Sequence, residues 1–195
     1  MSKIFIVMGK SATGKDTIFK EIMKRLHEQL STVILYTTRP IRTGETEGVE
    51  YHFVTREERD SLKEQGKIIE ERVYHTVLGD WFYFTADDGQ IDLSNQSYMM
   101  ISTLEGYESL VRYFGKEQVV PIYIEVEDGE RLQRALSREM SQASPKYEEL
   151  CRRFLADQDD FKEENLKRLQ IEKRYSNYDK EQCIKHILSD IEPLI

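Results

Sequence analysis

Cysteine is scarce in this chain, and no long apolar run occurs in its 195 residues. The two cysteines, Cys151 and Cys183, and the four scattered histidines have no spacing typical of a disulfide framework or a zinc site. The longest apolar runs, Ile4–Met8 and Val119–Ile124, are far shorter than the roughly 20 residues of a membrane span. Because the first run is also too short for a signal peptide, we expect a cytoplasmic protein without a membrane partner.

An excess of basic residues is also absent. The chain has 28 Lys and Arg against 36 Asp and Glu, a net charge of −8. Nucleic-acid binding needs a basic face, so the composition argues against a nucleic-acid partner. With 39% hydrophobic and 33% charged residues, the sequence is typical of a soluble globular domain.

The order of predicted elements indicates an α/β fold. Strands expected at 4–8, 32–36, 98–102 and 119–125 alternate with helical segments, a pattern that predicts a parallel sheet flanked by helices. The region 32–95 interrupts this order with a helix over 56–65 and short strands at 67–74 and 81–85, which indicates an inserted lobe. Further helices are predicted at 107–114, 130–141, 146–170 and 181–192. Ser144-Pro145 is expected to cap and open the third of these.

A glycine-rich loop follows the first strand. Gly9-x4-Gly14-Lys15 is a Walker A pattern in which backbone N–H groups cradle phosphates and Lys15 reaches the β- and γ-phosphates of ATP. The pattern's final Ser or Thr, a magnesium ligand, is replaced by Asp16, with Thr17 next as the competing candidate. The predicted ATP-binding residues of the loop are Gly9, Lys10, Ser11, Ala12, Thr13, Gly14, Lys15, Asp16 and Thr17. The alternative is a glycine-rich turn that arose by chance.

A second basic segment follows at residues 37–53. Arg39 and Arg42 lie three residues apart on a loop that Gly44 and Gly48 punctuate, so their guanidinium groups can converge on one phosphate, with the Tyr51 hydroxyl beside them. The alternative is a solvated basic loop.

This segment, Thr37-Thr38-Arg39-Pro40-Ile41-Arg42-Thr43-Gly44-Glu45 followed by Gly48, Tyr51 and Phe53, resembles the GMP-binding lobe of guanylate kinases. Ser11 in the phosphate loop and the arginines of later helices extend the resemblance over nearly the whole chain. It implies a P-loop NTPase-type sheet with an inserted mixed-β lobe and a helical lid. It also implies that Arg39, Arg42 and Tyr51 hold the acceptor's phosphate, that Glu70 accepts hydrogen bonds from guanine, and that Asn177 contacts the adenine of ATP. Without the resemblance, Glu70 reads equally well as an exposed strand residue.

The resemblance also implies lid arginines that bridge the donor and acceptor phosphates. Arg138 and Arg153 best match those positions, although Glu139 replaces the glycine that follows the first of them. For Arg131 and Arg134, which share a helical face with Arg138, we favour simple ion pairs with Glu127 and Glu130 on a solvated face.

The positions that read guanine depart from the family pattern. Leu35 stands where the family has a serine, and Thr103 where it has an aspartate that faces guanine. Another usual acid is replaced by Ile101, and the family's Tyr-Tyr-Gly stretch is replaced by Trp81-Phe82-Tyr83. Each lost hydrogen bond to a buried partner is worth about 1–3 kcal/mol, so the preferred base stays open.

These observations predict one guanylate-kinase-like domain over residues 1–195, with a core at about 1–31, 97–126 and 165–195, an acceptor lobe at 32–96 and a lid at 127–164. The expected activity is transfer of the γ-phosphoryl group from ATP with Mg²⁺ to GMP or a related monophosphate, by a monomer or a homodimer. The predicted catalytic residues are Lys15, Arg42, Arg138 and Arg153, and the predicted monophosphate-binding residues are Arg39, Arg42, Tyr51, Glu70 and Thr103. Two alternatives remain: a non-catalytic binding module of the same fold, and a P-loop kinase for another phosphorylated small molecule.

Overall fold

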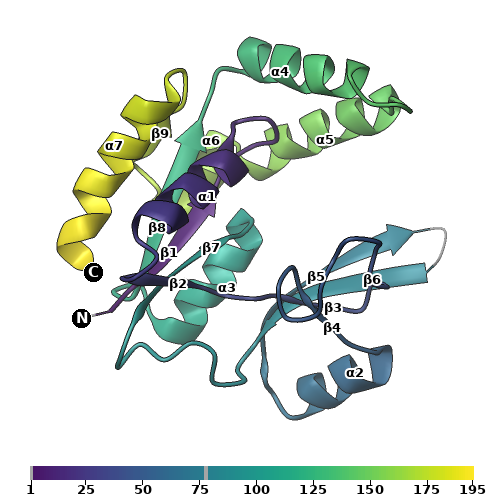
Figure 1. The fold of residues 1–195 in the computed structure, drawn as a ribbon, viewed down its shortest axis with the longest axis vertical. Helices are drawn as coiled ribbons and strands as arrows, with labels where there is room; N and C mark the ends of the chain where they lie inside the picture. The colour runs from purple at the N-terminus through teal and green to yellow at the C-terminus, as the bar shows by residue number, and fades with distance from the viewer. Residues whose placement is uncertain (1, 77–78) are drawn as a thin grey trace.

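A computed structural model describes residues 2–76 and 79–195; residue 1 and residues 77–78, which fall within the predicted core and lobe, lie outside the described residues. Five parallel strands form the main sheet in the order β2-β7-β1-β8-β9 (Figure 1). Their bounds are β1 (Ile4–Met8), β2 (Leu30–Thr32), β7 (Ser97–Ile101), β8 (Val119–Glu125) and β9 (Arg174–Ser176). The predicted parallel sheet is confirmed, and its central strand β1 is buried along its whole length.

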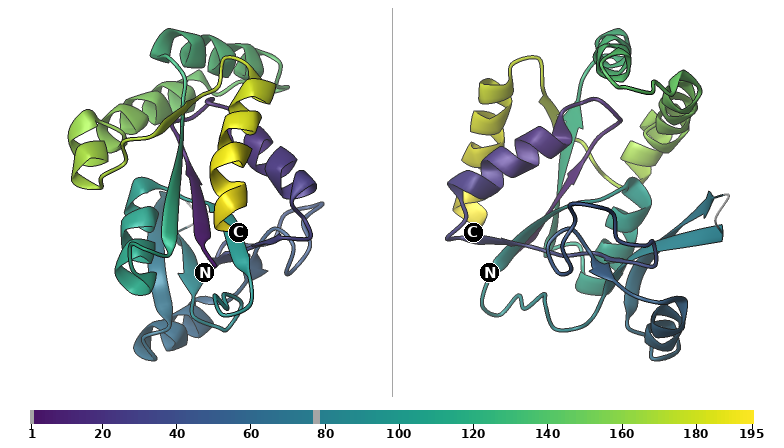
Figure 2. Two further views of the ribbon diagram at one scale, coloured as in Figure 1. Left: turned by 90° about the vertical axis from the view of Figure 1, so that its left-hand side faces the viewer. Right: turned by 45° about the vertical axis from the view of Figure 1, so that its right-hand side comes forward.

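Helices cover both faces of this sheet, as Figure 2 shows. Successive side chains of a strand point to opposite faces, so β1 contributes to two separate cores. Phe5 and Val7 pack with α1 (Lys15–Arg25) and α7 (Lys180–Ile191). Ile4, Ile6 and Met8 pack with α3 (Leu104–Phe114) and with Phe161, Leu166 and Ile171.

The inserted lobe is a second, mixed sheet with strand order β4-β3-β6-β5. It comprises β3 (Tyr36–Thr37), β4 (His52–Phe53), α2 (Arg56–Glu64), β5 (Ile68–Thr76) and β6 (Gly79–Ala86). A capping box opens α2, because the Thr55 side chain accepts a hydrogen bond from the Glu58 amide and the Glu58 carboxylate accepts one from the Thr55 amide. A small core around Phe82 and Phe84 holds the lobe together.

Two helices of the remaining segment lie side by side on the far side of the phosphate loop from the lobe (Figure 1). They are α4 (Asp128–Met140) and α5 (Tyr147–Asp160), followed by the short α6 (Glu163–Arg168). A 3-10 turn, η1 (Glu192–Leu194), follows α7. None of the described helices is both long enough and apolar enough to cross a membrane.

Three local predictions are wrong. The strand expected at 32–36 is two strands, because the chain leaves the main sheet after Thr32 and joins the lobe sheet at Tyr36. The helix expected at 146–170 breaks after Asp160, where Phe161 turns inward and stacks on Tyr123 with ring centroids 5.5 Å apart. Ser144-Pro145 does not open α5, because the helix begins at Tyr147. The residue before it, Lys146, donates a hydrogen bond from its amide to the Glu139 carboxylate.

Candidate active site

The phosphate loop connects β1 to α1 at the carboxyl end of the parallel strands. Gly14 has φ +84°, and a Cβ there would lie 2.6 Å from Asn177 Nδ2, so only glycine suits this position. Gly9 approaches the main chain of β8, since a Cβ there would lie 2.5 Å from the Ile124 carbonyl oxygen. Among the described residues no side chain caps α1, so the N–H groups of its first turn remain directed at the loop.

Asn177 holds the phosphate loop through a hydrogen bond to its main chain. It follows β9, is buried, and donates a hydrogen bond of 2.7 Å from Nδ2 to the Thr13 carbonyl oxygen. Thr13 is itself buried, and its hydroxyl donates to the Lys10 carbonyl oxygen at 2.9 Å. In this structure Asn177 therefore supports the loop, a role that the resemblance to an adenine-contacting asparagine does not include.

Lys15, Asp16 and Thr17 lie at the start of α1. The Lys15 ammonium is 3.8 Å from the Asp16 carboxylate, whose side chain is 72% exposed. Thr17 is exposed as well. The start of α1 thus offers the Lys15 ammonium for phosphate, and the Asp16 carboxylate and the Thr17 hydroxyl on the solvent side for a metal.

Side chains of α4 and α5 brace the loop in a way that the sequence does not predict. The Ser11 amide donates to Asp157 at 2.8 Å, and Lys10 pairs with Asp128 at 3.3 Å. Arg131, only 1% exposed, donates to the Ser11 carbonyl oxygen at 2.9 Å and pairs with both carboxylates. The predicted solvated ion pair of Arg131 is therefore wrong, because this side chain is turned inward to the loop.

The charges of this brace shift the pKa of Asp128. Partial burial opposes its ionisation, but hydrogen bonds from Gln158 and Arg131 and the Lys10 charge outweigh burial and lower the pKa to about 2. No local sequence pattern marked Asp128, Asp157 or Gln158, since they come from two helices and meet only at the loop. By contrast, Arg134 pairs with Glu130 as predicted, and it also donates to the Asn177 carbonyl oxygen.

Arg39 lies at the centre of the second site and is 3% exposed. Its guanidinium forms two hydrogen bonds with Glu45, at 2.8 and 2.9 Å, and donates to the Tyr83 hydroxyl at 3.1 Å. The Tyr51 and Phe53 rings lie 5.5 and 5.4 Å from it. The hydrogen bonds between Arg39 and Glu45 lower the pKa of the Glu45 carboxyl and raise the pKa of the Arg39 guanidinium.

Arg42 and Tyr51 border this arginine. The Arg42 side chain is exposed, while its amide donates to the same Glu45 carboxylate at 2.8 Å. Burial raises the pKa of Tyr51, so its hydroxyl stays protonated and able to donate. The structure therefore brings Arg39, Arg42 and Tyr51 to one place, with Glu45 occupying the guanidinium fork of Arg39.

Glu70 and Thr103 differ in what they offer a ligand. Glu70 on β5 is 4% exposed, so the interpretation as an exposed strand residue is wrong; it accepts a hydrogen bond from Thr85 at 2.9 Å. Thr103 instead caps α3, its hydroxyl accepting from the Gly106 amide at 3.2 Å. Leu35 packs against the core.

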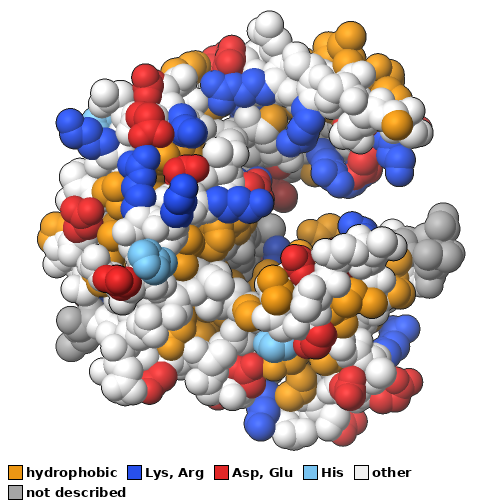
Figure 3. All heavy atoms as spheres, viewed as in Figure 1, with side chains coloured by type: hydrophobic (Ala, Val, Ile, Leu, Met, Phe, Trp, Pro, Cys, Tyr) orange, Lys and Arg blue, Asp and Glu red, His pale blue; other side chains and the backbone are white. Residues whose placement is uncertain are grey.

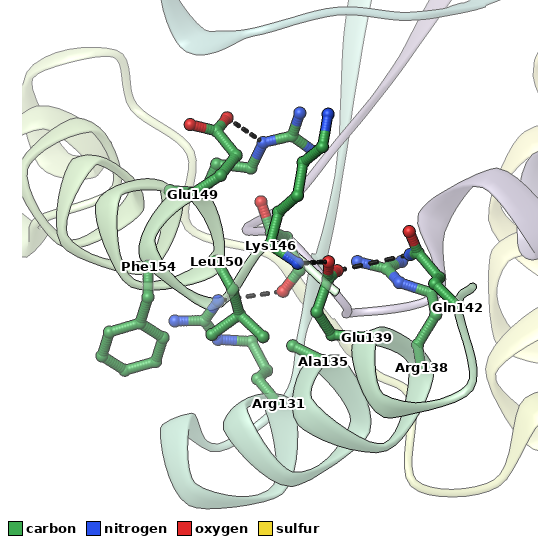
Figure 4. Close-up of a pocket in the computed structure, with 11 residues that line it drawn as sticks. Arg131, Ala135, Arg138, Glu139, Gln142, Lys146, Glu149, Leu150 and Phe154 are labelled. Atoms are coloured by element: carbon green, nitrogen blue, oxygen red, sulfur yellow. Dashed lines mark hydrogen bonds and ion pairs between the residues drawn. The ribbon is translucent and has the colours of Figure 1, made fainter. Parts of the chain in front are cut away.

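Arg138 and Arg153 line a cavity of about 160 Å³ between α4 and α5 (Figure 4). Ser11 of the phosphate loop borders it, and its charged lining comprises four basic side chains, Lys146 and Arg131 among them, and two acidic ones, Glu139 and Glu149. Arg152 and Arg153 each donate a hydrogen bond of 2.7 Å to Glu149. These bonds lower the pKa of Glu149 to about 2, and the bond from Arg152 has the largest effect. In the space-filling view a deep cleft separates this part of the molecule from the lobe (Figure 3).

Comparison with known proteins agrees with this architecture. Residues 1–86 match the family model described as guanylate kinase. The chain is 37% identical over 102 residues to a guanylate kinase of Neisseria gonorrhoeae, a match that covers 52% of this chain and 47% of that protein. It thus spans about half the length of several curated relatives.

Two longer matches complete the comparison. A guanylate kinase of Chlorobaculum tepidum is 31% identical over 144 residues, which cover 73% of this chain and 71% of that protein. The crystal structure of guanylate kinase from Anaplasma phagocytophilum has the same fold, with a TM-score of 0.60 and 23% identity, over 98% of this chain and 85% of that one. On this sequence relationship and shared fold, the chain belongs to the guanylate kinase family.

Proposed function

We propose that the protein transfers the γ-phosphoryl group of ATP to GMP or a related nucleoside monophosphate, giving ADP and a nucleoside diphosphate. The observation that carries this proposal is the cavity that Ser11 of the phosphate loop lines together with Arg138 and Arg153. Phosphoryl transfer requires position and positive charge rather than covalent chemistry from the protein, and such a cavity supplies both. Membership of the guanylate kinase family supports the same reaction.

In this proposal residues 9–17 bind ATP. The backbone of Gly9, Lys10, Ser11, Ala12, Thr13 and Gly14 cradles the phosphates, Lys15 pairs with the β- and γ-phosphates, and Asn177 holds the loop through Thr13. Arg138 and Arg153 stabilise the charge on the transferring group from the lid. The core comprises residues at about 1–31, 97–126 and 165–195. Residues 32–96 act as the acceptor lobe, and residues 127–164 act as the lid.

The donors at the start of α1 fit a magnesium ion bound with ATP. Mg²⁺ keeps several waters and takes one or two protein oxygens besides the phosphates, and Asp16 and Thr17 present such oxygens. Within residues 2–76 and 79–195, no group of three or more His, Cys, Asp or Glu side chains could hold a metal by itself. Asp16, with Thr17 as the second candidate, would hold the ion, which neutralises charge on the β- and γ-phosphates when bound.

The acceptor's phosphate binds at Arg39, Arg42 and Tyr51. Arg39 reaches it by exchanging Glu45 for phosphate oxygens, which bind a guanidinium fork in the same two-pronged way. The acceptor phosphate is already anionic, so the reaction needs no general base. Glu70 receives the base at the inner end of the lobe, next to α3, where Thr103 caps the helix.

The test is ADP release from ATP and Mg²⁺ with GMP, dGMP, AMP, CMP, UMP and dTMP, with Lys15→Ala as the inactive control. We expect turnover with GMP that the control lacks. Binding of ATP without turnover of any acceptor would contradict the proposal and favour another phosphorylated acceptor. Failure to bind ATP would favour a non-catalytic module. An Asp16→Asn variant with unchanged Mg²⁺ dependence would remove Asp16 from the metal site.

A further inference from the structure

Three buried polar atoms where the lobe meets the end of β7 and α3 have no hydrogen-bond partner within the described part of the chain. They are Glu70 Oε2, Arg72 Nε and Ser102 Oγ. Buried polar atoms are nearly always paired, so three unpaired ones in one place indicate a site that a ligand completes.

Glu70 Oε2 lies near both of the other atoms. Arg72 Nε lies 3.3 Å from Glu70 Oε2, close enough for an ion pair but without hydrogen-bond geometry, while a terminal nitrogen of the same guanidinium donates to Glu70 Oε1 at 3.4 Å. A Cβ added at Gly106 would lie 3.4 Å from Glu70 Oε2 and 2.2 Å from Ser102 Oγ, so both oxygens face the same point on α3. A carboxylate acceptor thus stands between a guanidinium donor and a hydroxyl.

This group shares a face of the lobe sheet with the site for the acceptor's phosphate. Glu70 and Arg72 are two residues apart on β5, so their side chains lie on the same face. Arg72 is paired across the sheet with Tyr83, whose hydroxyl accepts a hydrogen bond from Arg39. A ligand with its phosphate at Arg39 therefore extends its other end toward Arg72 and Glu70.

The order of donors and acceptors matches the edge of guanine. That edge carries a carbonyl acceptor, O6, next to two donors, N1–H and the N2 amino group. Arg72 can donate to O6 while Glu70 accepts from N1–H and the amino group. Adenine in the same pose places its unprotonated N1 against the Glu70 carboxylate, an unfavourable contact between two acceptors.

We propose that Arg72 is a specificity-determining residue whose guanidinium reads the O6 carbonyl of a guanine-type base beside Glu70. The inference rests on the proposed function, since it assumes a nucleoside monophosphate acceptor. Arg72 takes over hydrogen bonding that Leu35 cannot supply, because its side chain is apolar, and that Thr103 does not supply, because its hydroxyl caps α3.

The experiment measures dissociation constants of GMP, IMP and AMP by calorimetry for the wild type, Arg72→Ala and Arg72→Gln. IMP keeps O6 and N1–H but lacks the amino group. Arg56→Ala is the matched control, because Arg56 lies over Phe82, a residue whose side chain points to the opposite face of the lobe sheet from that of Tyr83. Thermal midpoints and binding of a non-hydrolysable ATP analogue check that each variant is folded.

Loss of Arg72 is expected to weaken GMP and IMP equally, by about 10- to 100-fold, and AMP by less than about threefold. Arg56→Ala is expected to bind all three as the wild type does. An unchanged preference for GMP over AMP, or tighter GMP binding without Arg72, would overturn the inference. If the alanine variant does not fold, the same dissociation constants are compared for Arg72→Gln, which keeps most of the side-chain volume.

These outcomes separate the two proposals. Wild-type turnover of GMP with no effect of Arg72→Ala contradicts only the role of Arg72. GMP binding that depends on Arg72 without phosphoryl transfer contradicts only the kinase activity. A wild type that binds neither GMP nor IMP contradicts both.

Discussion

Replacing Arg131 by methionine tests whether a buried ionic contact joins α4 and α5 to the phosphate loop. The guanidinium donates to Asp128 Oδ1 at 2.7 and 3.0 Å and to the Ser11 carbonyl oxygen at 2.9 Å, and it pairs with Asp157 at 3.4 Å. Methionine fills much of the same space but makes none of these contacts. Ser11 and the two carboxylates then lose their shared partner.

The expected cost follows from the exposure of the partners. Removing one member of a buried ion pair costs about 3–5 kcal/mol, because the other charge stays buried without compensation. The Asp128 side chain is 40% exposed and keeps Lys10 and Gln158, so we expect the lower limit, about 3 kcal/mol of unfolding free energy. For a chain of this length such a loss lowers Tm by roughly 6–12 °C.

Urea unfolding monitored by circular dichroism measures this loss. Arg152→Met is the matched control, since Arg152 on α5 forms an exposed pair with Glu149 and should cost less than about 1 kcal/mol. In Arg131→Met/Asp157→Asn the two losses should fall short of additivity by about 1 kcal/mol or more, because the two residues share one contact. A free energy of unfolding for Arg131→Met within about 1 kcal/mol of the wild type would refute the reasoning.

Three further predictions concern the loop, the brace and the thiols. Gly14→Ala should weaken ATP binding at least about tenfold in a fluorescent-nucleotide titration, because the new Cβ would meet Asn177. The control is Gly89→Ala, at a position with φ +88° and open space around it. This variant should lose only about 1 kcal/mol of stability and bind ATP as the wild type does. Since the folded-state pKa of Asp128 is lowered from 3.8 to about 2, its ionised form stabilises the protein above pH 3.8 and that contribution is lost as the pH falls toward 2. After a discount for its exposure, Asp128→Asn should cost about 1 kcal/mol at pH 7, and urea midpoints of the two proteins should converge by about pH 2. With an aromatic disulfide reagent, exposed Cys151 should react in the native protein while Cys183, buried and with its pKa raised to about 11 by burial, should react only after unfolding; rapid reaction of both thiols would contradict this.

The local patterns of the chain determined its class of fold. A continuous apolar run followed by Gly9-x4-Gly14-Lys15 and a helical repeat of apolar residues allows few structures other than a strand, a phosphate loop and a helix. Strands at 98–102 and 119–125 were predictable for the same reason, since each is a short apolar segment between helical ones. The capping box at Thr55 and Glu58 is likewise a local signal, and it marks the start of α2.

Contacts between distant segments decided the rest. The brace at Ser11 joins residues more than a hundred positions apart, and no local pattern distinguishes Asp157 from the other acids of its charged helix. Arg131 and Arg134 are alike in sequence, yet packing buries the first against the loop and leaves the second half exposed beside Glu130. Glu70 and Arg72 gain their meaning only when β5 lies against α3 and places Ser102 beside them. Sequence period and spacing thus determined most of the elements, because these depend on neighbouring residues, although the split at 32–36 and the break at Phe161 needed distant contacts. The environment of each charge was decided by the tertiary structure, because burial and partners are set by segments far apart in the chain.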